Sequence, residues 1–326
     1  MSAAIEWLRR QRPGRAAVPS PSPVDIAPAT SHRDGMNAMR RVDDWADVFA
    51  TLHRLRERGP RRVATSPATG SPIDRALPGE EIAPGLWRHT THRAWPQAPW
   101  TLALGELATP SPAARRRGAP PLPERIDASR LVLFDTETTG LAGGTGTRAF
   151  MVGLARFTAE GLAITQFTTA TMAAEAAMLR AVLDAVGEDA VLVSYNGKSY
   201  DRPLLGTRLR LSRIDDPLSR FPHLDLLHAT RRRLRGTLPD CRLSTVERQW
   251  LGIVRDDDLP GSEAPAAWLG FLRGGSAALL RRVGEHNAQD LASLAALLLK
   301  HLAEPAPSAP ANVADQRIAP AITRRS

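Results

Sequence analysis

Apolar runs between about residues 128 and 303 alternate with polar segments in a way that predicts a series of strands and helices. Short runs rich in β-branched and aromatic residues predict strands, and longer segments with apolar residues three and four positions apart predict helices. The predicted strands cover 131–135, 148–157, 162–169, 190–196 and 221–227. The predicted helices cover 173–186, 201–211 and 276–302. Three consecutive strands followed by alternating helices and strands predict an α/β fold, with a mixed five-stranded sheet flanked by helices.

The segments on either side of this region have a different composition. Residues 1–84 are interpreted as an N-terminal extension that is mostly disordered, with one amphipathic helix near 42–58. Residues 85–127 combine short strand-like runs, consistent with a hairpin, with a Pro- and Arg-rich linker. The ordered domain then covers 128–303, and the Pro- and Ala-rich tail 304–326 is expected to be disordered.

Arginine supplies almost all of the positive charge. The net charge is +9, and Lys198 and Lys300 are the only lysines. A planar guanidinium pairs with phosphate through two hydrogen bonds, so this composition favours nucleic acid as a partner. A general preference for arginine codons is the alternative explanation. Cys241 is the single cysteine, which excludes a disulfide or a zinc–thiolate site within one chain.

Nothing in the sequence predicts contact with a membrane. No apolar run reaches the roughly 18 residues that a membrane-spanning helix needs. Residues 1–15 are charged but lack the apolar core of a secretory signal. We therefore expect a cytoplasmic protein with no membrane partner.

Residues 135–147, DTETTGLAGGTGT, allow two interpretations, one through the glycines and one through the carboxylates. Gly144, Gly146 and Ala149 match the G-x-G-x-x-A fingerprint of dinucleotide-binding proteins. That fingerprint needs a strand directly before it and a helix directly after it. Here the predicted strand ends nine residues before Gly144, another strand follows, and no P-loop lysine comes after Gly146. The glycines are therefore better interpreted as a turn.

The carboxylates of this stretch are better placed for chemistry. Asp135 and Glu137 point to the same side, because side chains alternate along a strand. Two such carboxylates at the end of an apolar strand repel each other unless a cation neutralises them, and solvated carboxylates at a loop are the alternative. Asn196 and Asp201 follow the strand at 190–196. Asp201 opens the next predicted helix, where a helix cap is the alternative role.

The last predicted helix carries a second polar pair. His286 and Asp290 are one turn apart on one face, where they interrupt a stripe of Leu and Val. A buried histidine is usually a hydrogen-bonded core residue, but a histidine and an aspartate together in an apolar core are costly unless they are paired or bind a metal. With the other carboxylates they supply the components of a two-metal site, in which cations about 3.5–4 Å apart act on a phosphodiester. In such a site His286 is the candidate proton acceptor.

The combination of motifs resembles the three motifs of the DEDD 3′–5′ exonucleases: Asp135-x-Glu137, Asn196-x-x-x-Tyr200-Asp201 and His286-x-x-x-Asp290. More narrowly, the chain resembles the YprB-like ribonuclease H-like bacterial proteins, which are predicted exonucleases. The phrases that carry this resemblance are FDTETTGLAGGTGT, SYNGKSYDRPLL, LSTVERQWLGI, DDLPG and EHNAQDLASLAALL, and it covers roughly 128–302. It implies a ribonuclease H-like fold, with three antiparallel strands before the first helix, and a hydrolase that uses two Mg²⁺ or Mn²⁺ ions.

The resemblance also implies roles for individual residues. The implied metal ligands are Asp135, Glu137, Asp201 and Asp290. His286 is the candidate base, although DEDD enzymes with a histidine usually space it as His-x4-Asp, and His-x3-Asp is the spacing of the tyrosine subclass. The candidate substrate contacts are Thr138, Gly140, Asn196, Lys198, Tyr200 and Asn287. Asp225 is expected either to support the metal ligands from behind or to cap a helix.

We therefore expect a metal-dependent 3′–5′ exonuclease that hydrolyses phosphodiester bonds of single-stranded DNA or RNA. The basic run at 231–235 is expected near the mouth of its site, where it would contact phosphates of the strand, with a solvated face as the alternative. Two other functions stay open on the same fold: a non-catalytic nucleic-acid-binding or scaffold protein, and a structure-specific endonuclease. All four carboxylates of the motifs are present, which favours an enzyme.

Overall fold

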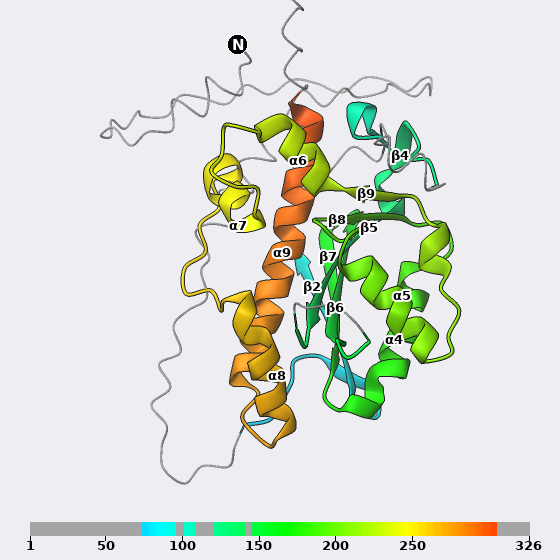
Figure 1. Ribbon diagram of the computed structural model, residues 1–326, viewed down its shortest axis with the longest axis vertical. Helices are drawn as coiled ribbons and strands as arrows, with labels where there is room; N and C mark the ends of the chain where they lie inside the picture. The colour runs from blue at the N-terminus through cyan, green and yellow to red at the C-terminus, as the bar shows by residue number, and fades with distance from the viewer. Residues whose placement is uncertain (1–73, 96–100, 109–119, 141–144, 305–326) are drawn as a thin grey trace, which may run out of the picture.

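The computed structural model describes residues 74–95, 101–108, 120–140 and 145–304. The helix expected near 42–58, the rest of the N-terminal extension up to residue 73 and the tail from residue 305 lie outside the described residues. The described part consists of a central sheet with helices on both faces, as Figure 1 shows.

A seven-stranded mixed sheet forms the centre of this part of the chain, in the order β1-β2-β7-β6-β5-β8-β9. Its strands span Glu80–Ala83 (β1), Leu86–Arg93 (β2), Leu131–Thr138 (β5), Ala149–Thr158 (β6), Gly161–Thr169 (β7), Val191–Ser194 (β8) and His223–Asp225 (β9). Neighbours from β1 to β5 pair antiparallel, whereas β8 is parallel to both β5 and β9. A separate antiparallel pair is formed by Thr101–Ala103 (β3) and Arg125–Asp127 (β4).

The strands β7-β6-β5-β8-β9 form the mixed five-stranded sheet that the sequence predicts. The strand-like runs expected to form a hairpin become β2 and β3, which do not pair with each other: β2 joins this sheet between β1 and β7, and β3 pairs with β4. β2 pairs with β7 along its whole length, from Leu86 opposite Thr169 to Arg93 opposite Leu162. The outer edge of β7 offers a row of unpaired backbone N–H and C=O groups, which an adjacent strand satisfies. The sheet is therefore two strands wider than the sequence predicts.

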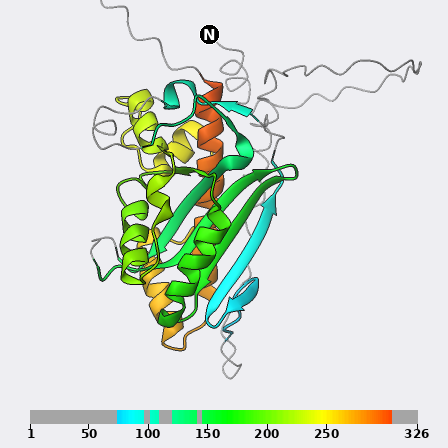
Figure 2. The same ribbon diagram turned by 90° about the vertical axis from the view of Figure 1, so that its right-hand side faces the viewer.

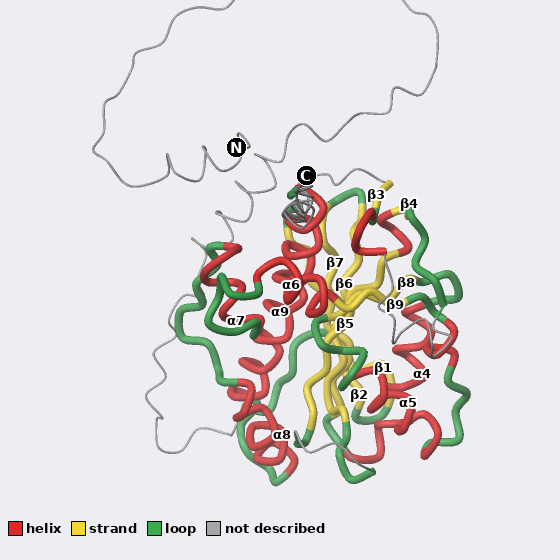
Figure 3. The backbone as a smooth tube through the Cα atoms, turned by 45° about the horizontal axis from the view of Figure 1, so that its top comes forward, coloured by secondary structure: helices red, strands yellow, loops and turns green. Residues whose placement is uncertain are grey.

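Helices cover both faces of the sheet (Figures 1 and 2). One face is covered by Ala278–Ala303 (α9), and the other by Glu175–Val186 (α4) and Asp201–Leu211 (α5). Figure 3 shows the strands between α9 and the pair α4 and α5. The helices that pack beside α9 are Leu226–Leu234 (α6), Leu243–Val246 (α7) with the π-helical turn Glu247–Leu251, and Ala264–Leu272 (α8). Single 3-10 turns lie at Gly105–Ala108, Ala128–Arg130, Met172–Ala174, Pro217–Arg220 and Gly261–Glu263.

The long C-terminal helix that the sequence predicts is confirmed as α9. Val283, Leu291 and Leu298 on its apolar stripe are at most 1% exposed, because they pack against the sheet and its covering helices. In the part of the chain that the structure describes, no helix combines the length and the apolarity that crossing a bilayer requires.

Alternation along β5 places the predicted carboxylates on the α9 side of the sheet. The apolar half of the strand divides between the two core layers, with Leu131 and Leu133 beneath α9, and Val132 and Phe134 beneath α4 and α5. The same alternation continues to the end of the strand. Asp135 and Glu137 therefore face α9.

A buried ion pair on the opposite face holds the end of the glycine-rich loop. Arg208 of α5 donates to both carboxylate oxygens of Glu175 in α4, at 2.6 Å each, and to the carbonyl oxygen of Thr145 at 2.8 Å. Arg148 adds a hydrogen bond of 2.6 Å to Glu175. Arg208 is 5% exposed and Glu175 is 8% exposed. The pair thus anchors the connection from β5 to β6 against α4 and α5.

Replacing Arg208 with Met is expected to lower the free energy of unfolding by about 3 kcal/mol, because the buried Glu175 loses two charged hydrogen bonds and keeps only Arg148 as a charged partner. The double variant Arg208→Met/Glu175→Met removes both charges and is expected to recover most of that loss. Urea unfolding followed by circular dichroism measures both free energies. Equal losses in the single and the double variant would contradict this account of the pair.

Candidate active site

Polar side chains from three elements lie near the end of β5, with α9 on one face of the sheet and the start of α5 on the other. These side chains are Asp135 and Glu137 of β5, Asp201 at the start of α5, and His286 and Asp290 of α9. α9 contacts β5, and Asp201 accepts a hydrogen bond from the hydroxyl of Thr136 in β5. The structure therefore brings together the five residues that the sequence analysis predicts as catalytic.

Burial and like charge both oppose ionisation of the β5 carboxyl groups. Burial raises the pKa of Asp135 well above its ordinary value, and the charges of Asp290 and Asp201 add to this effect. Burial also raises the pKa of Glu137 to about 8, although His286 favours its ionised form. Carboxylates in such surroundings are stabilised by a nearby cation.

Asp201 is the first residue of α5 and is 7% exposed. Burial raises its pKa to about 6, and the hydrogen bond from Thr136 limits this rise. The N-cap position of α5 belongs to Tyr200. The structure therefore places Asp201 in the first helical turn, with its carboxylate on β5, and not in the capping role that the sequence left open.

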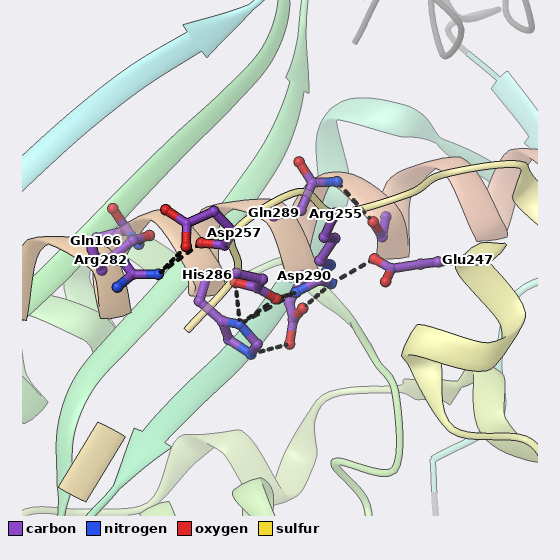
Figure 4. Close-up of polar contacts among 11 residues, drawn as sticks. Gln166, Glu247, Arg255, Asp257, Arg282, His286, Gln289 and Asp290 are labelled. Atoms are coloured by element: carbon purple, nitrogen blue, oxygen red, sulfur yellow. Dashed lines mark hydrogen bonds and ion pairs between the residues drawn. The ribbon is translucent and has the colours of Figure 1, made fainter. Parts of the chain in front are cut away.

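Arg255 lies among three carboxylates at the other side of the site (Figure 4). Its Nη2 donates to Asp290 and, at 2.5 Å, to Oε1 of Glu247. Its Nη1 lies 3.0 Å from Oδ2 of Asp258. Burial lowers the pKa of Arg255, but Asp290 and Glu247 raise it well above its ordinary value overall, so the guanidinium stays charged.

The sequence analysis missed Arg255. The phrase DDLPG, residues 257–261, was part of the resemblance, but no role followed from it. The available signal was an arginine directly before a run of three aspartates, in a chain where arginine is common. Only the contact between this loop and α9, 35 residues further along, distinguishes it from other arginines.

His286 is held by Asp258 on one side. On the other side it faces Asp290, as Figure 4 shows. Its Nδ1 lies 2.9 Å from both carboxylate oxygens of Asp258, and its Nε2 lies 3.7 Å from Oδ2 of Asp290. Burial lowers the pKa of His286, but the hydrogen bond to Asp258 and the charge of Asp290 raise it above its ordinary value overall. The ring thus presents Nε2 to the carboxylates, with Asp258 determining its orientation.

Three of the predicted substrate contacts lie where the glycine-rich loop leaves β5. The carbonyl oxygen of Gly140 accepts a hydrogen bond of 2.6 Å from the hydroxyl of Tyr200 and one of 3.0 Å from the hydroxyl of Thr138. Residues 141–144 of the loop lie outside the described residues, and β6 follows directly at Ala149. The contact of these three residues with a substrate stays a prediction.

Asp225 supports the turn that contains Asn196 and Lys198, two further residues predicted to contact the substrate. Its Oδ1 accepts hydrogen bonds from the backbone N–H groups of Asn196 at 2.8 Å and Leu227 at 3.1 Å, and its Oδ2 accepts from that of Lys198 at 3.0 Å. Asn196 has a φ of 68°, a left-handed conformation that a residue other than glycine adopts mainly where its surroundings hold it. Asp225 therefore both caps α6 and supports the turn between β8 and α5.

Replacing Asp225 with Ala is expected to lower the free energy of unfolding by about 1.5–3 kcal/mol, because three backbone N–H groups lose a charged acceptor. Asp240→Ala is the matched control, since Asp240 accepts from the backbone of Arg242 in an exposed turn and its loss is expected to leave the free energy of unfolding almost unchanged. Chemical unfolding measures both variants. A loss at Asp225 no larger than that at Asp240 would show that the turn does not depend on this carboxylate.

Asn287 lies behind Asp135 and is fully buried, at 0% exposed. Its Nδ2 donates to Oδ2 of Asp135 at 2.8 Å, and its Oδ1 accepts from Nε2 of Gln166 at 2.8 Å. The sequence analysis placed Asn287 at the substrate, and that contact stays a prediction. Gln166, in the middle of β7, was not singled out.

The basic run at 231–235 lies at the end of α6, beside the C-terminal end of α9. Arg233 donates to the carbonyl oxygens of His301 and Glu304. His301 is eleven residues beyond Asp290 in α9, which is about 16 Å along a helix axis. The structure thus places this run away from the carboxylates and not at their mouth.

The four predicted metal ligands are carboxylates, the donors that Mg²⁺ and Mn²⁺ prefer. Among the described residues, no three His, Cys, Asp or Glu side chains are grouped as they would be around an ion. Two contacts hold carboxylates away from such a group: the hydroxyl of Thr136 holds Asp201, and Arg255 holds Asp290. The chemistry of the donor set fits a divalent cation, and the Arg255 guanidinium supplies positive charge at Asp290.

Comparisons of the sequence agree on one family. The model of RNase_H_2, described as the RNase_H superfamily, matches residues 132–302. The uncharacterized protein YprB of Bacillus subtilis (strain 168) is 38% identical over 172 residues, which cover 52% of this chain and 41% of that relative. The chain therefore spans less than half the length of this curated relative.

Solved structures overlap with the chain only partly. A family B DNA polymerase from Pyrobaculum calidifontis has a TM-score of 0.43 and 19% identity, over 55% of this chain and 25% of the polymerase. The E. coli exonuclease I in complex with a dA16 oligonucleotide has a TM-score of 0.32 and 17% identity, over 50% of this chain and 45% of the exonuclease. Similarity at this level supports no conclusion about function.

The family match includes every element that brings a carboxylate to the site. Residues 132–302 contain all but the first residue of β5, the whole of α5, and α9 as far as Leu302. The match covers more than half of the chain, and this chain therefore belongs to the RNase_H superfamily.

Proposed function

We propose that this protein is a nuclease that depends on divalent metal ions and, more narrowly, a 3′–5′ exonuclease that acts on single-stranded DNA or RNA. The observation that carries the proposal is that four carboxylates from β5, α5 and α9 lie near the end of β5, close enough for the charges of Asp201 and Asp290 to act on Asp135, in a chain of the RNase_H superfamily. The proposal concerns the domain at 128–303, because the chain spans 41% of its YprB relative. The expected cytoplasmic location stays a prediction.

The residues that would hold two Mg²⁺ or Mn²⁺ ions are Asp135, Glu137, Asp201 and Asp290. When bound, such ions activate a water molecule and neutralise charge on the phosphate. Two side chains would turn to take part, Asp201 from its hydrogen bond with Thr136 and Asp290 from Arg255. Arg255 would keep Glu247 and Asp258 as partners when Asp290 turns away.

His286 is the proposed proton acceptor, at its Nε2. Asp258 holds Nδ1, so the opposite nitrogen faces the carboxylates. One helical turn separates His286 from Asp290, which keeps both side chains on the same face of α9. With the His-x3-Asp spacing of this chain, the proposed base would lie directly beside a proposed ligand.

The proposed substrate contacts lie on the α5 side of the carboxylates. Tyr200 and Thr138 meet at Gly140, where the glycine-rich loop begins. Lys198 lies in the turn between β8 and α5, and burial lowers the pKa of its ammonium group. An ammonium group that has lost part of its hydration gains from contact with an anion such as a phosphate. The net charge of +9 favours the approach of a polyanion.

The wild-type protein is expected to shorten single-stranded oligonucleotides from the 3′ end in the presence of Mn²⁺. Oligonucleotides of DNA and RNA labelled at either the 3′ or the 5′ end, together with a circular single strand, separate the possible activities. Asp135→Ala is expected to lower the rate by at least about 100-fold, because it removes one of the four carboxylates proposed to hold the ions. Asp184→Ala, an exposed carboxylate on α4, is the control and is expected to retain full activity.

Cleavage of the circle would favour an endonuclease. A protein that binds these strands but cuts none of them would favour the non-catalytic alternative. Equal activity in wild type and Asp135→Ala would contradict the assignment of this site.

Mn²⁺ at about 100 times its dissociation constant is expected to raise the Tm of the metal-free protein by about 5–10 °C. The rise is expected to be larger at pH 8 than at pH 6. The folded-state pKa of Glu137, about 8, lies above its ordinary value of 4.5, so the stability of the metal-free protein falls as the pH rises between these values. A bound cation stabilises the ionised carboxylate of Glu137 and so restores the stability that the metal-free protein loses as the pH rises.

Differential scanning fluorimetry at both pH values measures this rise in Tm. The rise is expected to shrink in Asp135→Ala. The same rise in wild type and in Asp135→Ala would place the ion elsewhere on the protein.

A further inference from the structure

On the α9 side of the sheet, Asp135 begins a row of three residues that lie opposite one another in neighbouring strands. Asp135 of β5 stands opposite Gly153 of β6, and Gly153 stands opposite Gln166 of β7. Residues directly opposite one another in neighbouring strands share a face of the sheet. Toward α9, the row therefore carries the carboxylate of Asp135, no side chain at Gly153, and the amide of Gln166.

Asn287 of α9 fills the gap in this row. A Cβ atom at Gly153 would lie 2.1 Å from Oδ1 of Asn287 and 2.7 Å from Cδ1 of Leu291, both far inside normal contact distance. Glycine is thus the residue at this position of β6 that leaves room for the Asn287 side chain. The gap and the side chain that occupies it come from elements separated by more than 130 residues in the sequence.

The hydrogen bonds of the row have one consistent direction. The carbonyl oxygen of Gly284 only accepts, so the Gln166 group that bonds to it at 2.7 Å is the Nε2 donor. The same Nε2 donates to Oδ1 of Asn287 at 2.8 Å, which turns Nδ2 of Asn287 toward Oδ2 of Asp135. Each orientation determines the next, from the backbone of α9 to the carboxylate.

Burial fixes the hydrogen-bond partners of the Asn287 and Gln166 amides. Asn287 is 0% exposed and Gln166 is 5% exposed, so neither amide can exchange its partners freely for water. If the amide of Asn287 turned over, it would place an oxygen against Oδ2 of Asp135 and an NH₂ group against Nε2 of Gln166. Both contacts would be repulsive, and buried polar groups without partners are costly.

We propose that Gln166, Asn287 and the gap at Gly153 form an orienting relay for Asp135. The relay holds Oδ2 with a donor that carries no charge and leaves Oδ1, which has no hydrogen-bond partner among the described residues, to bind a divalent cation. Asp135 needs such support because the charges of Asp290, Asp201 and Glu137 all act on it. Gln166 and Asn287 are thus positioning residues, and this inference rests on the proposed metal-dependent function.

The relay is tested by Mn²⁺ affinity, measured in the absence of nucleic acid by electron paramagnetic resonance of the free ion. Asn287→Leu removes the donor to Asp135, and Gln166→Met removes the group that orients it while keeping a side chain of similar length. Each variant is expected to weaken Mn²⁺ binding, by about tenfold or more for Asn287→Leu. Gly153→Ala removes no polar group, yet it displaces Asn287 and is expected to have the same effect.

Gly270→Ala in α8 is the matched control, because a Cβ atom there meets nothing within 4 Å, and its affinity is expected to equal that of the wild type. Urea unfolding identifies any variant that is not folded. If Gly153→Ala does not fold, the Mn²⁺ affinity of Gln166→Met still tests the relay. In the nuclease assay, the Mn²⁺ concentration for half-maximal rate is expected to rise in the relay variants. The KM for oligonucleotide at saturating Mn²⁺ is expected to stay constant in Gln166→Met, which a general structural defect would not produce.

Folded relay variants with wild-type affinity for Mn²⁺ would overturn the relay while leaving the proposed function intact. Wild-type protein that binds Mn²⁺ but cuts neither DNA nor RNA would overturn the nuclease, and the variant affinities would still decide the relay. Wild-type protein that binds no Mn²⁺ would overturn both.

Discussion

Like charge crowded into a small buried region is the constraint on which the rest of this structure depends. The side chains of Asp135 and Glu137 lie on one face of β5, and Asp290 of α9 lies above them. Burial raises the pKa values of Asp135 and Glu137 far above their ordinary values, and the neighbouring ionised carboxylates add to this rise. The surrounding groups either donate a hydrogen bond to these carboxylates or bring a positive charge to them.

The two sides of the site meet this constraint by different means. Asp135 is held by the amide of Asn287, which carries no charge and has no other place to turn. Asp290 is held by Arg255, a cation that also pairs with Glu247 and Asp258. An arginine with two remaining partners can release one carboxylate at modest cost, whereas a buried amide cannot. The arrangement therefore contains one carboxylate held by a neutral amide and one held by a charged guanidinium.

The strands and the long helix were predictable, because their periodicity is strong. β5, β6, β7 and α9 follow the predicted ranges closely. The helices α6, α7 and α8 have four to nine residues, too few for a clear helical repeat, and the sequence analysis did not find them. That β1 and β2 extend the main sheet was also missed, because strand partners depend on which edge is free in the folded protein.

The sequence by itself determined the local pairs of the site. A period of two puts Asp135 and Glu137 on one face of a strand, and a period of 3.6 puts His286 and Asp290 on one face of a helix. Only the tertiary structure decided which groups surround them. Asn287 lies 152 residues from Asp135, and Arg255 lies on a loop whose pattern is neither strand nor helix. Contacts over such separations follow from the packing of α9 across the sheet, and no local repeat in the sequence encodes that packing.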